Sequence, residues 1–153
     1  MEFFLQQNFV SVWHHFLSFE ISRSKFALET WGSANAYLIF QVIAWHHILV
    51  MIDESEARIR DEAVESWFKL TKAGFKTHTV LTYSLISSLT SLSIETVRRQ
   101  VKKLENDNWV FYSKKEGVKF RPSEKNNKFL ADIFNVKEVK DLGRLLDVFE
   151  KHK

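Results

Sequence analysis

The sequence predicts a mainly α-helical chain with one small β-hairpin near residues 109–121. Two observations carry this prediction. Apolar residues recur at helical spacing through most of the chain, and one run of aromatic and β-branched residues is interrupted by a turn that ends in glycine. The length of 153 residues suits one domain with helical extensions, and a composition with 45% hydrophobic residues supports a buried core. We expect an N-terminal helical region over 1–71, a central region over 72–126 and C-terminal helices over 127–153.

The N-terminal region contains two stretches without charge, Phe3–Phe19 and Thr30–Ile52. Both are long enough to span a membrane, but both contain Asn, Gln or His side chains that would need partners in hydrocarbon. We therefore expect Phe3 to about Phe19 and Ala34–Met51 to be helices that are buried or pack against a second subunit, with no membrane partner. No basic flank or small-residue cleavage site precedes the first stretch, so a signal peptide is not expected.

A third helix is predicted after the charged stretch Asp53–Asp61. Apolar residues follow at steps of four, four and three, as on one face of a helix: Ile59, Ala63, Trp67 and Leu70. Lys72–Thr79, around Gly74, reads as a connector. The carboxylates of this region lie in a hydrophilic stretch, and no nucleophile, base and orienting group occur together, so catalytic residues and a cofactor are not expected.

The motif V-x-x-W-H-H occurs twice in the N-terminal region, ending in His14-His15 and in His46-His47. Adjacent helical side chains point about 100° apart, so neither pair chelates one metal ion well. One histidine from each helix could still meet on a shared metal or haem. Core or interface histidines are the stronger interpretation, and we predict no metal site.

The central region begins with two helices joined by a tight connection. Tyr83–Leu89 is a short helix with Thr82 as its N-cap and an apolar face of Leu85, Ile86 and Leu89, and Ser93 is a good N-cap for a second helix. Ile94, Val97, Val101 and Leu104 recur at steps of three, four and three, which predicts one buried stripe. Asn108 is suited to a left-handed end of this helix. Its opposite side carries most of the charge: Glu95, Arg99, Lys102, Lys103 and Asn106, with Thr96 and Arg98 at the flanks.

Two strands are predicted next, Trp109–Ser113 and Val118–Arg121. Lys114–Gly117 is the turn between them, where Gly117 supplies a positive φ, and Pro122 ends the second strand. The order of short helix, tight turn, second helix and basic hairpin is that of a winged helix-turn-helix, in which a helix fits the DNA major groove and the hairpin reaches neighbouring phosphates.

The segment Ile86–Leu104 resembles the helix-turn-helix signature of bacterial winged-helix regulators, and residues 120–126 resemble the end of the wing in MarR-like proteins. Eight positions match the signature: Ile86, Leu92, Ser93, Thr96, Val97, Arg99, Val101 and Leu104. Ser87, Ser91, Asn108 and Asn126 depart from it. The resemblance covers about 45 of the 153 residues. It implies a DNA-binding transcriptional regulator with flanking helices that form a homodimer.

Charge is distributed in agreement with that expectation. Residues 1–71 hold five Lys/Arg and nine Asp/Glu, a balance of −4, whereas residues 72–153 hold 17 and 10, a balance of +7. We expect a recognition helix over about Ile94–Asp107 to enter the major groove of double-stranded DNA and the wing over Phe111–Arg121 to contact phosphates. Arg98 and Arg99 would read guanine and Glu95 cytosine, while Ser93 and Thr96 would touch phosphate or a thymine methyl. The expected phosphate contacts are Lys102, Lys103, Lys114, Lys115, Lys119 and Arg121.

Other interpretations remain open at this stage. The two-helix unit could serve as a protein-interaction module without sequence-specific DNA binding, in which case its apolar surface would matter more than its charge. A small apolar effector could bind between the aromatic N-terminal helices. An apolar helical stripe near the C-terminus is suited either to a dimer contact or to the chain's own core: Val136, Val139, Leu142, Leu145, Leu146 and Phe149. The absence of cysteine fits the cytoplasm.

Overall fold

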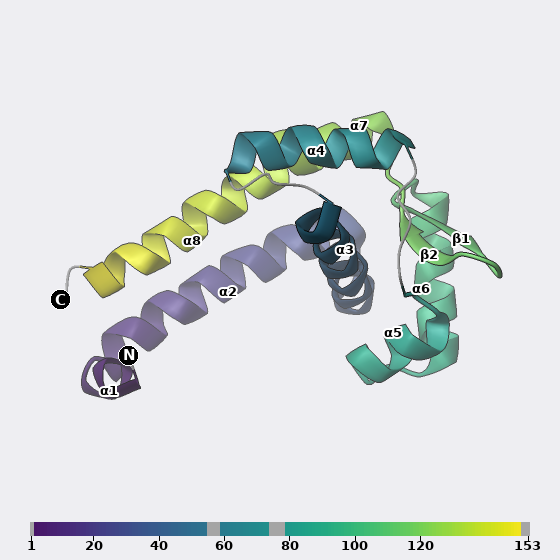
Figure 1. The fold of residues 1–153 in the computed structure, drawn as a ribbon. Coiled ribbons are helices and arrows are strands. Elements are labelled where there is room, and N and C mark those ends of the chain that lie inside the picture. The colour runs from purple at the N-terminus through teal and green to yellow at the C-terminus, as the bar shows by residue number, and fades with distance from the viewer. Residues whose placement is uncertain (1, 55–58, 74–78, 151–153) are drawn as a thin grey trace.

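The computed structural model describes residues 2–54, 59–73 and 79–150, which form a mainly helical chain with one two-stranded antiparallel sheet (Figure 1). Parts of the predicted charged stretch and connector, at residues 55–58 and 74–78, lie outside the described residues. The elements are α1 (Glu2–Gln7), α2 (Phe9–Trp31), α3 (Ala34–Glu54), α4 (Arg60–Ala73), α5 (Tyr83–Thr90), α6 (Ile94–Asn106), β1 (Val110–Ser113), β2 (Gly117–Phe120), α7 (Glu124–Phe129), the π-helical turn η1 (Leu130–Phe134) and α8 (Asn135–Glu150).

Helix α3 lies at the centre of the fold and contacts α2, α4, α5, α6 and β2. Most of its buried side chains belong to one hydrophobic cluster that extends from Ala27 on α2 to Phe134 in η1. The three predicted regions therefore share a core. Over Ala34–Ile52, α3 is also long and apolar enough to cross a membrane, and 39% of that stretch is buried within the fold.

Helices α1, α2 and α8 extend away from the end of the molecule that carries α5, α6 and the hairpin (Figure 1). The N-terminal helix breaks at Asn8 and runs on to Trp31, well beyond the predicted end at Phe19. Polar contacts hold this extension against α8: the Arg23 guanidinium lies 2.8 Å from the Glu138 carboxylate, and the Ser22 hydroxyl donates to Asp141 over 3.1 Å.

The predicted apolar surfaces of α2 and α8 are only partly covered within one chain. On α2, Val12 is buried, whereas other large side chains are exposed: Phe9, Val10, Trp13, Leu17 and Ile21. On α8, Leu145 is buried, and the remaining members of the predicted stripe are half-buried or exposed: Val136, Val139, Leu142, Leu146 and Phe149. The C-terminal stripe thus divides between the core and the surface.

The caps predicted for the central helices are confirmed. The Thr82 hydroxyl accepts a hydrogen bond from Leu85 N at 3.1 Å, and the Ser93 hydroxyl accepts one from Thr96 N at 3.2 Å. Ser91 and Asn108 both adopt left-handed backbone conformations, each with φ of 58°. Ser91 therefore supplies the turn geometry at the position where the regulator signature has glycine.

Helix α6 buries Val97, Val101 and Leu104, as its spacing predicts. The prediction is wrong for Ile94, which is the first residue of α6 and is 46% exposed. Leu89, on the predicted apolar face of α5, is 49% exposed.

The two predicted strands pair in an antiparallel hairpin, with Val110 opposite Phe120 and Ser113 opposite Gly117. Gly117 has φ of 70°, and a Cβ added there would lie 2.6 Å from the Leu81 carbonyl oxygen. That same carbonyl accepts a hydrogen bond from Val118 N at 2.8 Å. A glycine is thus needed both for the turn and for the close approach of the preceding chain.

The second V-x-x-W-H-H motif contributes a core histidine. His47 is 1% exposed and lies edge-on to Trp67, with ring centres 4.4 Å apart. Burial, with a smaller effect from His46, lowers the pKa of His47 to about 3. Its imidazole is therefore neutral at pH 7.

We expect acid to destabilise the fold through His47. The unfolded chain takes up this proton near the ordinary pKa of 6.5, and the folded chain only near 3. Stability is unaffected well above pH 6.5 and decreases as pH falls below it, by about 2 kcal/mol at pH 5. Denaturant unfolding at pH 8 and pH 5 measures this loss. The His47→Leu variant should lose less free energy of unfolding than the wild type between pH 8 and pH 5. An equal loss in both proteins would contradict the assignment of the acid effect to His47.

Candidate nucleic-acid interface

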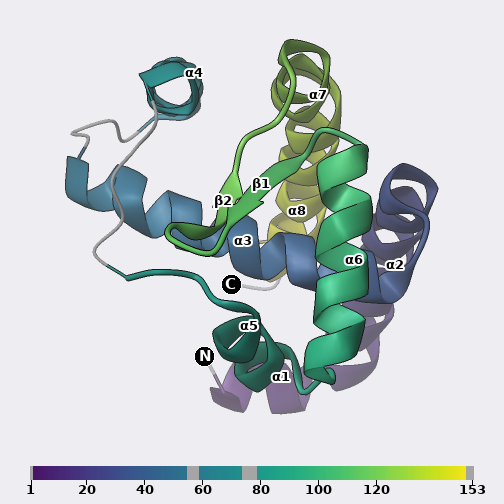
Figure 2. The ribbon, with the colours of Figure 1, turned by 90° about the vertical axis from the view of Figure 1, so that its right-hand side faces the viewer.

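The outward side of α6 is an exposed cationic surface of the central region. Figure 2 shows α6 upright at this end of the molecule, beside the hairpin and in front of α3. Its buried residues fix the rotation of the helix, which turns Arg98, Arg99 and Lys102 to solvent. Ser93 and Thr96 also hydrogen-bond through their hydroxyls at 2.9 Å, so the first turn is ordered by its own cap.

Two of these cations pair with carboxylates on the same helix. Arg98 lies 3.2 Å from Glu95, and Lys102 lies 3.1 Å from Glu105. Such exposed pairs contribute little energy and are readily exchanged for another anion. Glu105 has a second role, because its other carboxylate oxygen accepts a hydrogen bond from Tyr112 N at 3.2 Å and so ties α6 to the hairpin.

Arg99 and Lys103 differ in their surroundings. Among the residues that the structure describes, Arg99 forms no ion pair or side-chain hydrogen bond. Lys103, which we predicted as a phosphate contact, instead extends toward α2 and donates to the Trp31 carbonyl oxygen over 3.3 Å. It satisfies a carbonyl at the C-terminal end of α2, where a cation is also favoured by the helix dipole.

The predicted hairpin cations separate into two groups. Lys114 and Lys115 are exposed in the turn. Lys119 lies on the hairpin face opposite the buried Val118, and its ammonium is 2.6 Å from the Glu116 carboxylate. The Arg121 guanidinium lies over the Phe111 ring, 5.3 Å from its centre. Lys119 and Arg121 line a cavity next to α4, a placement that the sequence does not reveal.

The hairpin is fixed relative to α5 by an aromatic stack that sequence reasoning missed. The rings of Tyr83 and Tyr112 are 4.3 Å apart and nearly parallel. Burial raises the pKa of Tyr83 to about 12, so this hydroxyl stays neutral at physiological pH. The stack and the Glu105 contact together hold α5, α6 and the hairpin as one surface.

A separate apolar cavity of about 470 Å³ lies between α3, α4 and the start of α8. Ile48, Met51, Val64 and Leu130 contribute to its lining, and Arg60 is its cationic residue. Arg60 is held by Asn135, whose side-chain oxygen accepts from Nε at 2.9 Å. The cavity is large enough for a small apolar ligand, but it lies on α3 and α4 rather than between the two N-terminal stretches.

The histidine pairs do not assemble a metal site in the part of the chain that is described. No group of three or more potential His, Cys, Asp or Glu ligands occurs there. His14 and His15 are exposed on α2, whereas His47 is buried among aromatic rings on α3.

The chain matches no protein-family model, no curated protein and no solved structure.

Proposed function

We propose that this chain is a sequence-specific, double-stranded DNA-binding transcriptional regulator with a winged helix-turn-helix, and that it acts as a homodimer. In this proposal α6 enters the major groove, and the hairpin is the wing. The observation that carries it is Arg99, an exposed guanidinium without an ion-pair partner among the described residues, on the outward face of a capped amphipathic helix. A guanidinium in that position suits bidentate contact with guanine.

Two further features support the proposal. The exposed lysines of the hairpin turn, Lys114 and Lys115, are suited to neighbouring phosphates. The uncovered apolar side chains of α2 and α8 are suited to burial against a second copy, which would present two reading helices to a two-fold symmetric site.

Selection of bound duplexes from a random DNA pool tests this function. We expect enrichment of a two-fold symmetric motif. Arg99→Ala should reduce discrimination at one position of each half-site by about 10-fold or more, because one bidentate contact is worth roughly 1–3 kcal/mol. Arg144→Ala is the matched control, since Arg144 is an exposed arginine on α8. Undiminished discrimination by the Arg99 variant would refute the assignment of base reading to this residue.

The second candidate is a protein-interaction module that uses the same two helices. It is favoured by Leu89 and Ile94, two large apolar side chains that are exposed beside the α5–α6 connection. In that case the random pool yields no enriched motif. A partner complex would then be weakened more by Ile94→Ser than by Arg99→Ala.

A further inference from the structure

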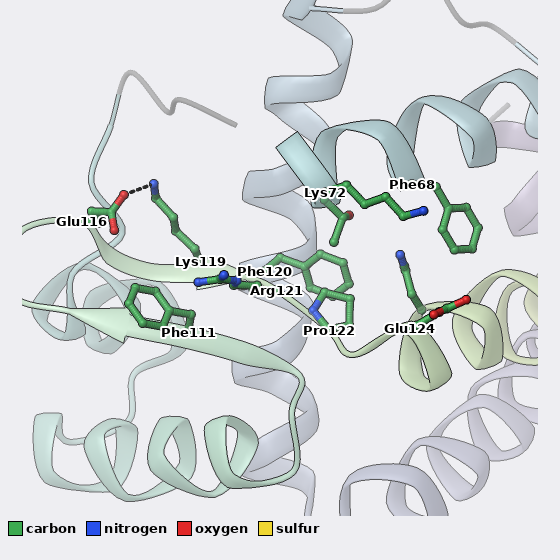
Figure 3. Close-up of a pocket in the computed structure, with 11 residues that line it drawn as sticks. Phe68, Lys72, Phe111, Glu116, Lys119, Phe120, Arg121, Pro122 and Glu124 are labelled. Carbon is green, nitrogen blue, oxygen red and sulfur yellow. Dashed lines mark hydrogen bonds and ion pairs between the residues drawn. The ribbon is translucent and has the colours of Figure 1, made fainter. Parts of the chain in front are cut away.

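A second cavity, of about 440 Å³, lies between the hairpin, the end of α4 and the start of α7. Its volume is in the range of small-molecule sites. Figure 3 shows Lys72 beside Phe68 at one end, Arg121 beside Phe111 at the other, and Phe120 and Pro122 between them. The cavity therefore combines aromatic walls with cations that come from two separate elements.

The charge around this cavity favours an anionic ligand. Lys72 and Arg121 form no ion pair among the residues described by the structure. The two carboxylates of the lining are each held by a lysine: Glu116 lies 2.6 Å from Lys119, and Glu124 lies 3.3 Å from Lys128. The Lys119 hydrogen bond keeps the pKa of Glu116 below its usual value, so this carboxylate stays ionised at neutral pH. Lys72 and Arg121, at opposite ends of the cavity, are therefore available to bind an anionic ligand.

The polar interior of the cavity is supplied by Asn127, which is only 4% exposed. Its side-chain oxygen accepts a hydrogen bond from Trp67 Nε1 at 2.7 Å, which fixes the orientation of the amide. The amide nitrogen donates to no residue in the described part of the chain, and it is not among the fully buried atoms that lack a partner. The Asn127 amide nitrogen is therefore held in a fixed position where it can donate a hydrogen bond to an acceptor atom of a ligand.

We propose that this cavity binds a nucleotide, with the base against Phe68 near Asn127 and the phosphate toward Arg121. A nucleobase combines a flat face for the aromatic wall with acceptor atoms at its edge for an amide donor. A phosphate monoester carries close to two negative charges at neutral pH, which suits the Arg121 end of the cavity, while Lys72 at the Phe68 end adds positive charge near the base. An apolar ligand would leave Lys72 and Arg121 without a partner of opposite charge, and the same two cations would repel a metal ion.

Binding of AMP to the full chain, measured by calorimetry without DNA, tests this proposal independently of the proposed regulator function. We expect AMP to bind, and adenosine and inorganic phosphate each to bind at least about tenfold more weakly, because each makes only part of the contacts. Arg121→Gln should weaken AMP by about tenfold or more, and Lys72→Gln should weaken it less, because Lys72 lies at the base end of the cavity. Both residues are exposed, so these variants should keep the fold, as a thermal unfolding scan would verify.

Lys114→Gln provides the matched control, because it removes the same charge from the hairpin at a residue outside the cavity lining. AMP affinity should be unchanged in this variant. An equal loss in all three variants, phosphate that binds as well as AMP, or no binding at millimolar AMP would each overturn the proposal. TMP and a short oligothymidylate distinguish the sources of the nucleotide. Binding of the oligomer alone, sensitive to Arg121 and Lys72, would overturn a free nucleotide as the ligand.

Discussion

Trp31→Ala should destabilise the fold by about 3–5 kcal/mol, because it removes a large buried aromatic side chain and leaves a cavity. Trp31 is 2% exposed and ends α2 in the middle of an aromatic cluster. Its ring centre lies 4.4 Å from that of Phe40 on α3, 5.6 Å from Trp109 before the hairpin, and 4.9 Å from Phe134 in η1. Denaturant unfolding measures the loss. Since these contacts join residues of the N-terminal, central and C-terminal regions, one cooperative transition is expected.

Trp31→Phe separates ring packing from polarity at the same position. Among the described residues the indole Nε1 of Trp31 has no hydrogen-bond partner, so replacing it removes an unsatisfied buried donor as well as volume. We therefore expect Trp31→Phe to lower the free energy of unfolding much less than Trp31→Ala does. Trp45→Ala is the control for loss of an indole at the surface, because Trp45 on α3 is 53% exposed, and it should change stability by less than about 1 kcal/mol. A loss below that level for Trp31→Ala would contradict the central role of this residue.

Features that depend on neighbours in the sequence could be predicted from it. The caps at Thr82 and Ser93 each involve a backbone N–H three residues later. The left-handed residue Asn108 and the turn glycine Gly117 follow in the same way from local backbone preferences. This is why the two central helices and the hairpin agree closely with their predicted ranges.

Features that depend on distant parts of the chain could not be predicted. Lys103 has the helical position of a groove contact, but its partner carbonyl belongs to Trp31, 72 residues earlier. The sequence predicts that the first helix ends at about Phe19, before the polar residues Ser22 and Arg23. Helix α2 nevertheless continues through both residues, because α8 supplies their hydrogen-bond and ion-pair partners. The cavity beside the hairpin arises from α4, β2 and α7 together, and no local pattern marks it.

Duplex DNA binding should weaken steeply with salt, and the slope should report the number of chains bound. Three of the predicted phosphate contacts are exposed on α6 or in the hairpin turn and do not bond to α2: Lys102, Lys114 and Lys115. If each neutralises one phosphate, the log–log slope is about −2.7 for one chain and about −5.4 for two. Between 50 and 200 mM salt, the affinity would then fall roughly 40-fold for a monomer and roughly 2,000-fold for a dimer.

Replacing both turn lysines, Lys114→Gln with Lys115→Gln, should make the slope less steep by about 2 per bound chain and weaken all duplex sequences to a similar extent. The double variant Lys125→Gln with Lys140→Gln removes the same charge from exposed positions on α7 and α8. It should leave the slope unchanged, because only cations close to the phosphates release counterions when DNA binds. Sedimentation of the complex measures the number of chains separately. Equal changes in the two double variants would show that net charge, rather than a defined hairpin contact, governs binding.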